Sequence, residues 1–227
     1  AITNERVESR VYVEGSRVYL SYERMCEVKA AKRIVSMLLQ EGFDEIRDLD
    51  EKIDRAEKNL HQRLAPSQRN AVKLCLSYPI SIMTGGPGSG KTTTLRFILD
   101  IYQAAFPSNE ILLAAPTGRA SRRMSEQTDK YASTLHSALG LVTEEDSPLN
   151  DTEMLSADLI VVDEFSMVDM RLAYVLLERI KPGAQLIIVG DADQLPSVGA
   201  GNVLREMIRS EKVPTAVLET VFRQASN

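Results

Sequence analysis

Tryptophan is absent from the 227-residue sequence, and the other aromatic residues are few, with five phenylalanines and seven tyrosines. Modules that hold single-stranded nucleic acid mainly by base stacking need several aromatic side chains on one surface. This scarcity therefore argues against a stacking module as the main function of the chain.

Cysteine is also scarce. Cys26 and Cys75 fall within helix-like patterns and lack the paired spacing of metal-binding motifs. Two such thiols favour a reducing compartment over a disulfide framework. No apolar run approaches the roughly 18 residues that a membrane-spanning helix needs, and the amino terminus does not resemble a secretion signal. We therefore expect a cytoplasmic protein with no membrane partner.

An excess of positive charge is missing too, since 27 Lys and Arg face 32 Asp and Glu, for a formal net charge of −5. This balance does not favour nucleic-acid binding, although a local basic surface along one face would be enough. Hydrophobic residues make up 44% and charged residues 26%, proportions typical of a globular protein. Because the chain begins with Ala rather than Met and ends soon after a motif, we expect a fragment of a longer protein.

The first part of the chain, residues 1–63, carries only weak patterns. A β-rich hairpin is predicted around Glu14 and Gly15, because both flanking segments are rich in Val and Tyr. An apolar helical pattern follows over residues 23–42, and a charged helical stretch over 49–62. We predict that this part is the remnant of an amino-terminal domain, a small α+β appendage.

The second part, residues 64–227, alternates short apolar runs with amphipathic stretches. Continuous Val, Ile and Leu runs separated by helices predict an α/β fold, with a mainly parallel sheet covered by helices on both faces. In such a sheet, ligands bind beyond the carboxyl ends of the strands. The predicted strands are 80–84, 111–115, 158–163, 185–190 and 215–219, and the predicted helices are 91–102, 118–128, 170–179 and 202–209.

A glycine-rich segment, GGPGSGKTTT, follows the first of these strands and precedes a helix. Its glycines allow positive φ angles and close backbone approach, so that N–H groups can surround a polyphosphate while the helix directs its positive end at the charge. A chance match to this pattern is expected in on the order of 1% of chains of this length. The predicted nucleotide-binding residues are Gly85, Gly86, Pro87, Gly88, Ser89, Gly90, Lys91, Thr92 and Thr93.

The glycine-rich segment and a second segment, DLIVVDEFSMVD, each supply polar groups at a predicted strand end. Lys91 is predicted to reach the β- and γ-phosphates of ATP and Thr92 to hold Mg²⁺. In DLIVVDEFSMVD, Asp163 can bind Mg²⁺ through water, and Glu164 is placed to orient and deprotonate the attacking water. The alternative for this acidic pair, a solvated strand end, is less favoured because a phosphate loop precedes it.

The segment VGDADQLPSVGAGN also lies at a predicted strand end. Gln194 is predicted to sense the γ-phosphate as a polar, uncharged reporter, with Asp191 bracing it. An ordinary turn is the alternative interpretation, since Gly, Asp and Pro are turn residues.

These segments together resemble the motifs of superfamily 1 DNA helicases, in order along residues 64–225. LAPSQRNAV resembles the Q motif, GGPGSGKT motif I, APTGRASRRM motif Ia and STLHSALG motif Ib. VVDEFSMVD resembles motif II, VGDADQLPSVGAG motif III and VFRQA the start of motif IV. The combination is most similar to RecD-like helicases, which include the α subunit of exodeoxyribonuclease V and stand-alone relatives. The resemblance implies that residues 64–227 form a RecA-like P-loop NTPase domain that uses ATP and Mg²⁺.

The resemblance also implies roles for single residues. Gln68 would bond the adenine edge, and Arg223 would contact the γ-phosphate. Arg122 and Arg123 are candidate phosphate contacts, with a solvated helix face as the alternative. For His136, a structural hydrogen bond is the alternative to a DNA contact. The implied DNA-binding residues, in motifs Ia and Ib, are Pro116, Thr117, Arg119, Thr134 and His136.

The implied function is ATP hydrolysis coupled to 5′–3′ translocation on single-stranded DNA and to unwinding at duplex junctions, in recombinational repair. Partners would include other exodeoxyribonuclease V subunits if the parent is part of that complex. Residues 141–156 match the position of the strand-separating hairpin of the family, but they are acidic and lack an aromatic wedge, so a surface loop is the simpler interpretation.

Two departures from the family pattern limit what this chain is expected to do alone. Nothing resembles motifs V or VI, and in the family motif VI supplies an arginine finger from a second RecA-like domain. We therefore expect the isolated chain to be nearly inactive. The alternatives to a helicase motor are a P-loop ATPase of another class and a nucleotide-binding module that recruits partners.

Overall fold

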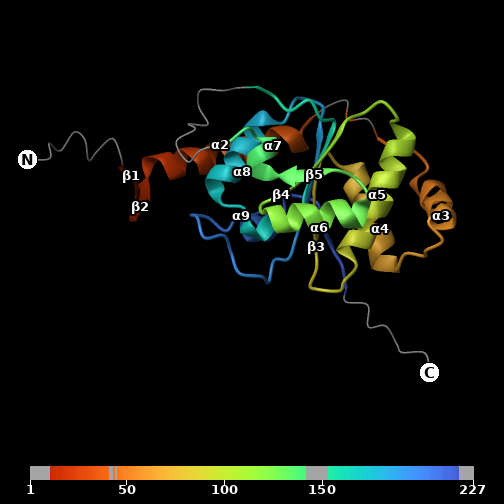
Figure 1. Cartoon of the computed structure of the whole chain (residues 1–227). Coiled ribbons are helices and arrows are strands. Elements are labelled where there is room, and N and C mark those ends of the chain that lie inside the picture. The colour runs from red at the N-terminus through yellow and green to blue at the C-terminus, as the bar shows by residue number, and fades with distance from the viewer. Residues whose placement is uncertain (1–10, 41–42, 44, 142–152, 220–227) are drawn as a thin grey trace, which may run out of the picture.

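The structure is a computed structural model of the chain, and it describes residues 11–40, 43, 45–141 and 153–219. A sheet of six strands has the order β5-β4-β6-β7-β3-β8. The sheet lies between helices at the centre of the structure (Figure 1). Every pairing in this sheet is parallel, which confirms the predicted fold class. The strands are β3 (Ile80–Thr84), β4 (Ile111–Ala115), β5 (Ala132–Thr134), β6 (Leu159–Val162), β7 (Gln185–Gly190) and β8 (Thr215–Val217).

Helices cover both faces of the sheet. One face is covered by α2 (Ser21–Leu38), α7 (Leu135–Ala138), α8 (Met170–Arg179) and α9 (Val203–Arg209). The other is covered by α3 (Leu49–Asn59), α4 (Pro66–Ser77), α5 (Lys91–Ala105) and α6 (Gly118–Thr128). A short 3₁₀ turn, η1 (Phe165–Met167), follows β6. None of the helices in the described part of the chain has the length and apolar character that a membrane span requires.

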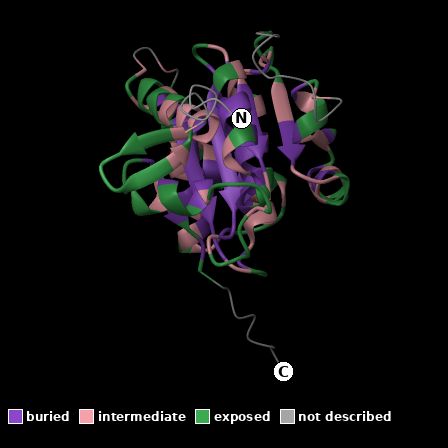
Figure 2. Ribbon diagram, turned by 90° about the vertical axis from the view of Figure 1, so that its left-hand side faces the viewer, coloured by how far each residue is buried: buried purple, intermediate pink, exposed green. Residues whose placement is uncertain are grey.

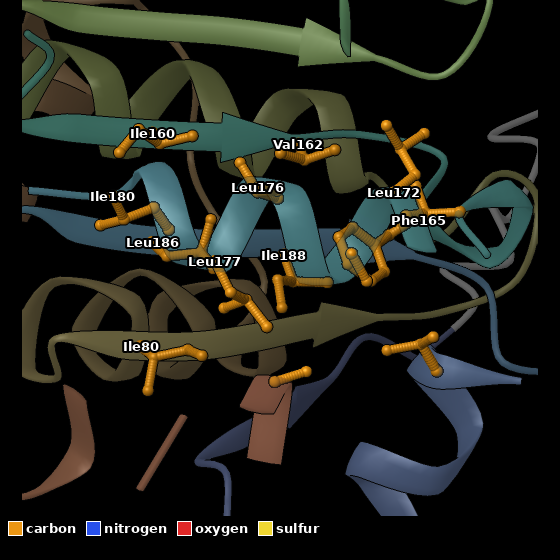
Figure 3. Packing of buried hydrophobic residues seen from close by; sticks show 14 of the residues in the cluster. Ile80, Ile160, Val162, Phe165, Leu172, Leu176, Leu177, Ile180, Leu186 and Ile188 are labelled. Atoms are coloured by element: carbon orange, nitrogen blue, oxygen red, sulfur yellow. The ribbon is translucent and has the colours of Figure 1, made fainter. Parts of the chain in front are cut away.

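The buried residues are concentrated in the strands and on the helix faces that meet them (Figure 2). Successive side chains of a strand point to opposite faces, so β6 supplies Ile160 and Val162 to one core and Leu159 and Val161 to the other. Figure 3 shows the first of these cores, in which strand residues pack against Leu176 of α8. Burial on both faces explains why these strands are continuous apolar runs rather than alternating ones.

Near the amino terminus, β1 (Val11–Glu14) and β2 (Arg17–Leu20) form the predicted antiparallel hairpin. Gly15 takes a φ of 59° in its turn. The helix that follows, α2, packs on α8, and Arg33 donates hydrogen bonds to the carbonyl oxygens of Leu177 (3.2 Å) and Ile180 (2.5 Å). Buried residues of α2 and α3 belong to the same clusters as the sheet. The proposed domain boundary near Arg63 stays a prediction.

Candidate active site

The glycine-rich loop joins β3 to α5 at the carboxyl edge of the sheet. Gly88 has a φ of 75° and Gly90 a φ of 85°, both in the left-handed region that favours glycine. A Cβ on Gly85 would lie 2.8 Å from the carbonyl oxygen of Leu218, and a Cβ on Gly90 would collide with Nε2 of Gln68. The loop conformation therefore requires glycine at these positions.

Side chains of the loop bond to carbonyl oxygens of the loop itself. Nζ of Lys91 donates to the carbonyl oxygens of Gly85 (2.5 Å) and Gly86 (3.1 Å). The buried Ser89 hydroxyl donates to the same Gly86 oxygen at 2.8 Å. An ammonium group thus lies beside the first turn of α5, whose N-terminus carries a partial positive charge. Together they make this edge of the sheet suited to a phosphate chain.

Gln68 belongs to the preceding helix, α4, and its side chain lies against the glycine-rich loop. Its side chain is buried, and Oε1 accepts a hydrogen bond from the Ala65 backbone N–H at 2.9 Å. This bond satisfies a backbone donor at the start of α4. The Nε2 group faces Gly90. The predicted adenine-binding residue therefore also holds the end of its helix, a role that the sequence analysis did not predict.

Asp163 and Glu164 follow β6, the strand that pairs with β7 in the sheet. Oδ1 of Asp163 accepts a hydrogen bond from the Glu164 backbone N–H at 2.8 Å. Burial raises the pKa of the Asp163 carboxyl, while the Glu164 N–H and the charges of Lys91 and Arg123 lower that pKa in part. A carboxylate whose burial is incompletely compensated is suited to a cation.

Glu164 has a φ of 52°, an uncommon conformation for a residue with a side chain. Such backbone strain is costly, and it is found at functional sites more often than elsewhere. Here it turns the chain sharply from β6 into η1. The turn places Glu164 at the exit of the strand, between Asp163 and the 3₁₀ turn.

The loop after β7 connects two other parts of the site. The Ser166 hydroxyl of η1 donates to Oε1 of Gln194 at 3.4 Å, and the Gln194 N–H donates to the carbonyl oxygen of Asp191 at 3.3 Å. The Ala192 N–H donates to Oγ1 of Thr84, the last residue of β3, at 3.3 Å. The segment carrying Gln194 therefore touches both the end of β3 and the turn after Glu164.

The predicted metal ligands fit Mg²⁺ rather than a metal held by protein alone. Among the described residues, no group of three or more His, Cys, Asp and Glu side chains is arranged to hold a metal ion. Mg²⁺ is usually bound through one or two carboxylates together with substrate phosphates and water. The Thr92 hydroxyl and the Asp163 carboxylate are oxygen donors of the kind that Mg²⁺ prefers.

The predicted DNA-binding residues lie at or just beyond the carboxyl ends of β4 and β5, and two of them also cap helices. Thr117 accepts from the Ala120 N–H at 3.2 Å at the start of α6, and Thr134 accepts from the Ser137 N–H at 3.1 Å at the start of α7. Arg119 and His136 are exposed, and Pro116 is half-buried. A basic hollow of about 470 Å³ is lined by Gly118, Arg119, Arg122, Arg123 and Glu126.

Some predictions fall on parts of the chain outside the described residues. Arg223 and the rest of the VFRQA segment lie there, as do residues 142–152 of the acidic interval 141–156. Conversely, the structure shows one contact that was not predicted. The Thr92 hydroxyl donates to Oε1 of Gln127 in α6 at 3.2 Å. No sequence motif marks Gln127, since the two residues meet only through packing of α5 and α6.

Comparison with known proteins finds similarity over the region that contains these site residues. A family model described as an AAA domain matches residues 68–200. The ATP-dependent RecD2 DNA helicase of Deinococcus radiodurans is 35% identical over 210 residues, which cover 92% of this chain and 28% of that protein. The RecBCD enzyme subunit RecD of Mycobacterium tuberculosis is 40% identical over 172 residues, which cover 65% of this chain and 30% of that protein.

A solved structure, the Pif1 helicase from Candida albicans, superposes with a TM-score of 0.55 at 26% identity, over 73% of this chain and 42% of that one. The chain spans under a third of the two curated relatives, 28% and 30% of their lengths. The family match includes the glycine-rich loop, Asp163, Glu164 and Gln194. The chain therefore belongs to the AAA domain family, and the curated relatives that it matches over part of their length are RecD helicases.

Proposed function

We propose that this chain is the Mg·ATP-binding motor domain of a DNA helicase. The observation that carries the proposal is the convergence at one sheet edge of the glycine-rich loop, the Asp163–Glu164 turn and the segment of Gln194. Nucleotide binding itself follows from the family. We add the chemistry of the site and the helicase activity that it would drive in the full-length protein.

In this proposal, the loop and Lys91 bind the β- and γ-phosphates. Lys91 exchanges its bonds to the Gly85 and Gly86 carbonyls for phosphate oxygens, and the loop N–H groups surround the charge. Thr92 and Asp163 hold Mg²⁺, which would neutralise charge on the phosphates. Gln68, whose Oε1 accepts from the Ala65 N–H and whose NH₂ group faces Gly90, would bond the adenine edge with its amide.

Glu164 is the general base of the proposed reaction. It accepts a proton from the attacking water, whose oxygen bonds to the γ-phosphorus as the bond to ADP breaks. Gln194 contacts the γ-phosphate, and its bond from Ser166 connects that contact to the turn after Glu164. Arg223 would supply a further positive charge to the γ-phosphate.

The proposed DNA contacts lie on the same edge of the sheet. The three exposed arginines of α6, Arg119, Arg122 and Arg123, line the basic hollow and suit the phosphate backbone. The charge of Arg123 also lowers the pKa of the Asp163 carboxyl. Pro116, Thr117, Thr134 and His136 would complete the surface that follows single-stranded DNA. In the full-length protein, we propose 5′–3′ movement and duplex unwinding in the cytoplasm, alone or with other exodeoxyribonuclease V subunits.

The first test concerns the phosphate site. Lys91→Ala is expected to weaken Mg·ATP binding about 10- to 100-fold, because a hydrogen bond to a charged group contributes about 1.5–3 kcal/mol. Titration calorimetry measures the affinity, and Lys32→Ala, an exposed lysine on α2, serves as the matched control. Unchanged affinity in the Lys91 variant would refute the assignment.

The second test separates the helicase from the two other functions that a nucleotide site permits. A P-loop ATPase of another class, or a module that only recruits partners, has no reason to respond to DNA. We expect ATP turnover by the full-length parent to rise on addition of single-stranded DNA. ATP turnover that does not change on addition of DNA would refute the helicase function, and only nucleotide binding would remain supported.

A further inference from the structure

The hydroxyl of Thr92 is held from a different helix. It donates its hydrogen to Oε1 of Gln127 at 3.2 Å, across 35 residues of chain. Thr92 lies in the first turn of α5 and Gln127 in the last turn of α6. The bond therefore joins the glycine-rich loop to the helix that follows β4.

This arrangement differs from the usual behaviour of a helical threonine. A threonine hydroxyl in a helix commonly donates to the carbonyl oxygen one turn earlier. Thr94 does so, donating to the Gly90 carbonyl oxygen at 3.0 Å. Thr92 instead donates to α6. The direction of its hydroxyl is thus set by a neighbouring helix rather than by its own.

The same face of α6 also acts on the other predicted metal ligand. Arg123 and Gln127 are four residues apart, so they lie on one side of the helix. The charge of Arg123 acts on the Asp163 carboxyl and lowers its pKa, against the larger effect of burial. Both oxygen ligands proposed for Mg²⁺ are therefore influenced by α6, one through Gln127 and the other through Arg123.

We propose that Gln127 is a positioning residue for the Thr92 hydroxyl in the Mg·nucleotide site. A hydroxyl has one hydrogen and two lone pairs, so a hydrogen committed to Oε1 of Gln127 leaves the lone pairs for the cation. Outer partners of this kind orient the ligands of a metal and tune its affinity. The inference rests on the proposed function, since it requires that Thr92 binds Mg²⁺.

The experiment uses this chain, fluorescently labelled ADP and a titration of Mg²⁺. Gln127→Met keeps the length of the side chain but removes the carbonyl acceptor, whereas Gln127→Glu keeps an acceptor oxygen. Gln103→Met is the matched control, because Gln103 is a half-buried glutamine in the last turn of α5 that donates to the Pro107 carbonyl oxygen at 3.2 Å. Thermal unfolding shows that each variant is folded.

We expect Gln127→Met to raise the Mg²⁺ concentration at half-maximal gain in ADP affinity by about three- to tenfold, the scale of one hydrogen bond. ADP affinity in the presence of a chelator should be unchanged. Gln127→Glu and Gln103→Met should need no more Mg²⁺ than the wild type. In a Thr92→Val background, Gln127→Met should add nothing, because the hydroxyl that it positions is gone.

Three results would overturn the inference. The first is a Gln127→Met variant with the Mg²⁺ requirement of the wild type. The second is an equal loss of ADP affinity with and without Mg²⁺, which would mean that Gln127 only supports the loop. The third is a further loss in the Thr92→Val background. A wild-type chain that binds ADP with no dependence on Mg²⁺ would instead contradict the proposed metal site, and the inference with it.

Discussion

The two polar groups of the Gln68 side chain contact two different segments of the chain. Its Oε1 accepts from the Ala65 N–H at the start of α4, while its Nε2 faces Gly90 in the phosphate loop. Adenine presents a donor beside an acceptor, N6 and N7, whereas guanine presents two acceptors. An amide with one donor and one acceptor therefore discriminates between the two bases.

Gln68→Ala is expected to reduce the preference for ATP over GTP about tenfold, the scale of one lost bidentate contact. It should also lower the free energy of unfolding by about 0.5–2 kcal/mol, because the Ala65 N–H loses its partner. Competition binding and thermal unfolding measure the two effects. Gln68→Glu keeps the acceptor for Ala65, so its stability should match the wild type. An unaltered preference in the Ala variant would refute base recognition by Gln68.

Glu164 is the residue whose substitution separates binding from chemistry. In the full-length parent, Glu164→Gln should retain ATP affinity and lose hydrolysis by roughly 10²-fold or more, the usual scale for a positioned general base. Steady-state turnover and calorimetry make the comparison. Glu178→Gln, an exposed glutamate on α8, is the control. Turnover near the wild-type rate would show that another group accepts the proton.

The phosphate loop shows what an element requires beyond its motif. Gly90 is the N-cap residue of α5, with a φ of 85°, and the space beside its Cα is occupied by the Gln68 amide. Two separate constraints, backbone conformation and packing against α4, thus fall on one residue. A motif shows only that glycine stands here, whereas the structure shows what the glycine allows.

Gly90→Ala is expected to lower the free energy of unfolding by about 1–2 kcal/mol, the cost of a side chain in the left-handed region. Nucleotide affinity should fall as well, since relief of the collision would move the loop or Gln68. Gly118→Ala at the start of α6 is the control, because nothing lies within 4 Å of its Cβ position. A Gly90→Ala protein with wild-type affinity would show that the loop does not need this conformation.

At the level of elements, the long buried strands were predictable and the short one was not. Four predicted strands matched to within a residue at each end, because strands buried on both faces are continuous apolar runs. Strand β5 has only three residues, Ala132, Ser133 and Thr134. Its strand conformation comes from pairing with β4, where Leu113 lies opposite Ala132. No local pattern carries that information.

Among the described residues, a single six-stranded parallel sheet carries the proposed nucleotide site. Helicase translocation needs two domains that open and close on DNA, and an arginine finger contributes about 10³–10⁵ in rate. We therefore expect the isolated chain to fold and bind nucleotide, to hydrolyse ATP very slowly and to leave duplex DNA intact. Strand displacement and phosphate-release assays measure these activities. Strong DNA-stimulated turnover by the chain alone would contradict this prediction.

Binding of the isolated chain to single-stranded DNA should be weak and should fall steeply with salt. The expected contacts are phosphate contacts from the basic hollow on α6, and phosphate contacts release counterions. The slope of log affinity against log salt concentration estimates their number, at about 0.7 per contact for single strands. Affinity that does not change with salt would point to base stacking instead.

The sequence by itself determined the fold class, the position of the glycine-rich loop between a strand and a helix, and the family. These depend on local patterns, because a strand, a glycine-rich loop and the start of a helix are adjacent along the chain. The acidic pair after β6 and the segment of Gln194 were also identified by their place at strand ends. Their common edge followed from the parallel sheet, since parallel strands all end on the same side.

Only the tertiary structure decided which residues touch across the site. The strand order places β6, β7 and β3 side by side, and this brings Ser166 to Gln194 and Ala192 to Thr84. Packing of α5 on α6 brings Thr92 to Gln127. Such pairs are distant along the chain and belong to no common motif. They depend on sheet order and helix packing, which are set by the whole core rather than by any one segment.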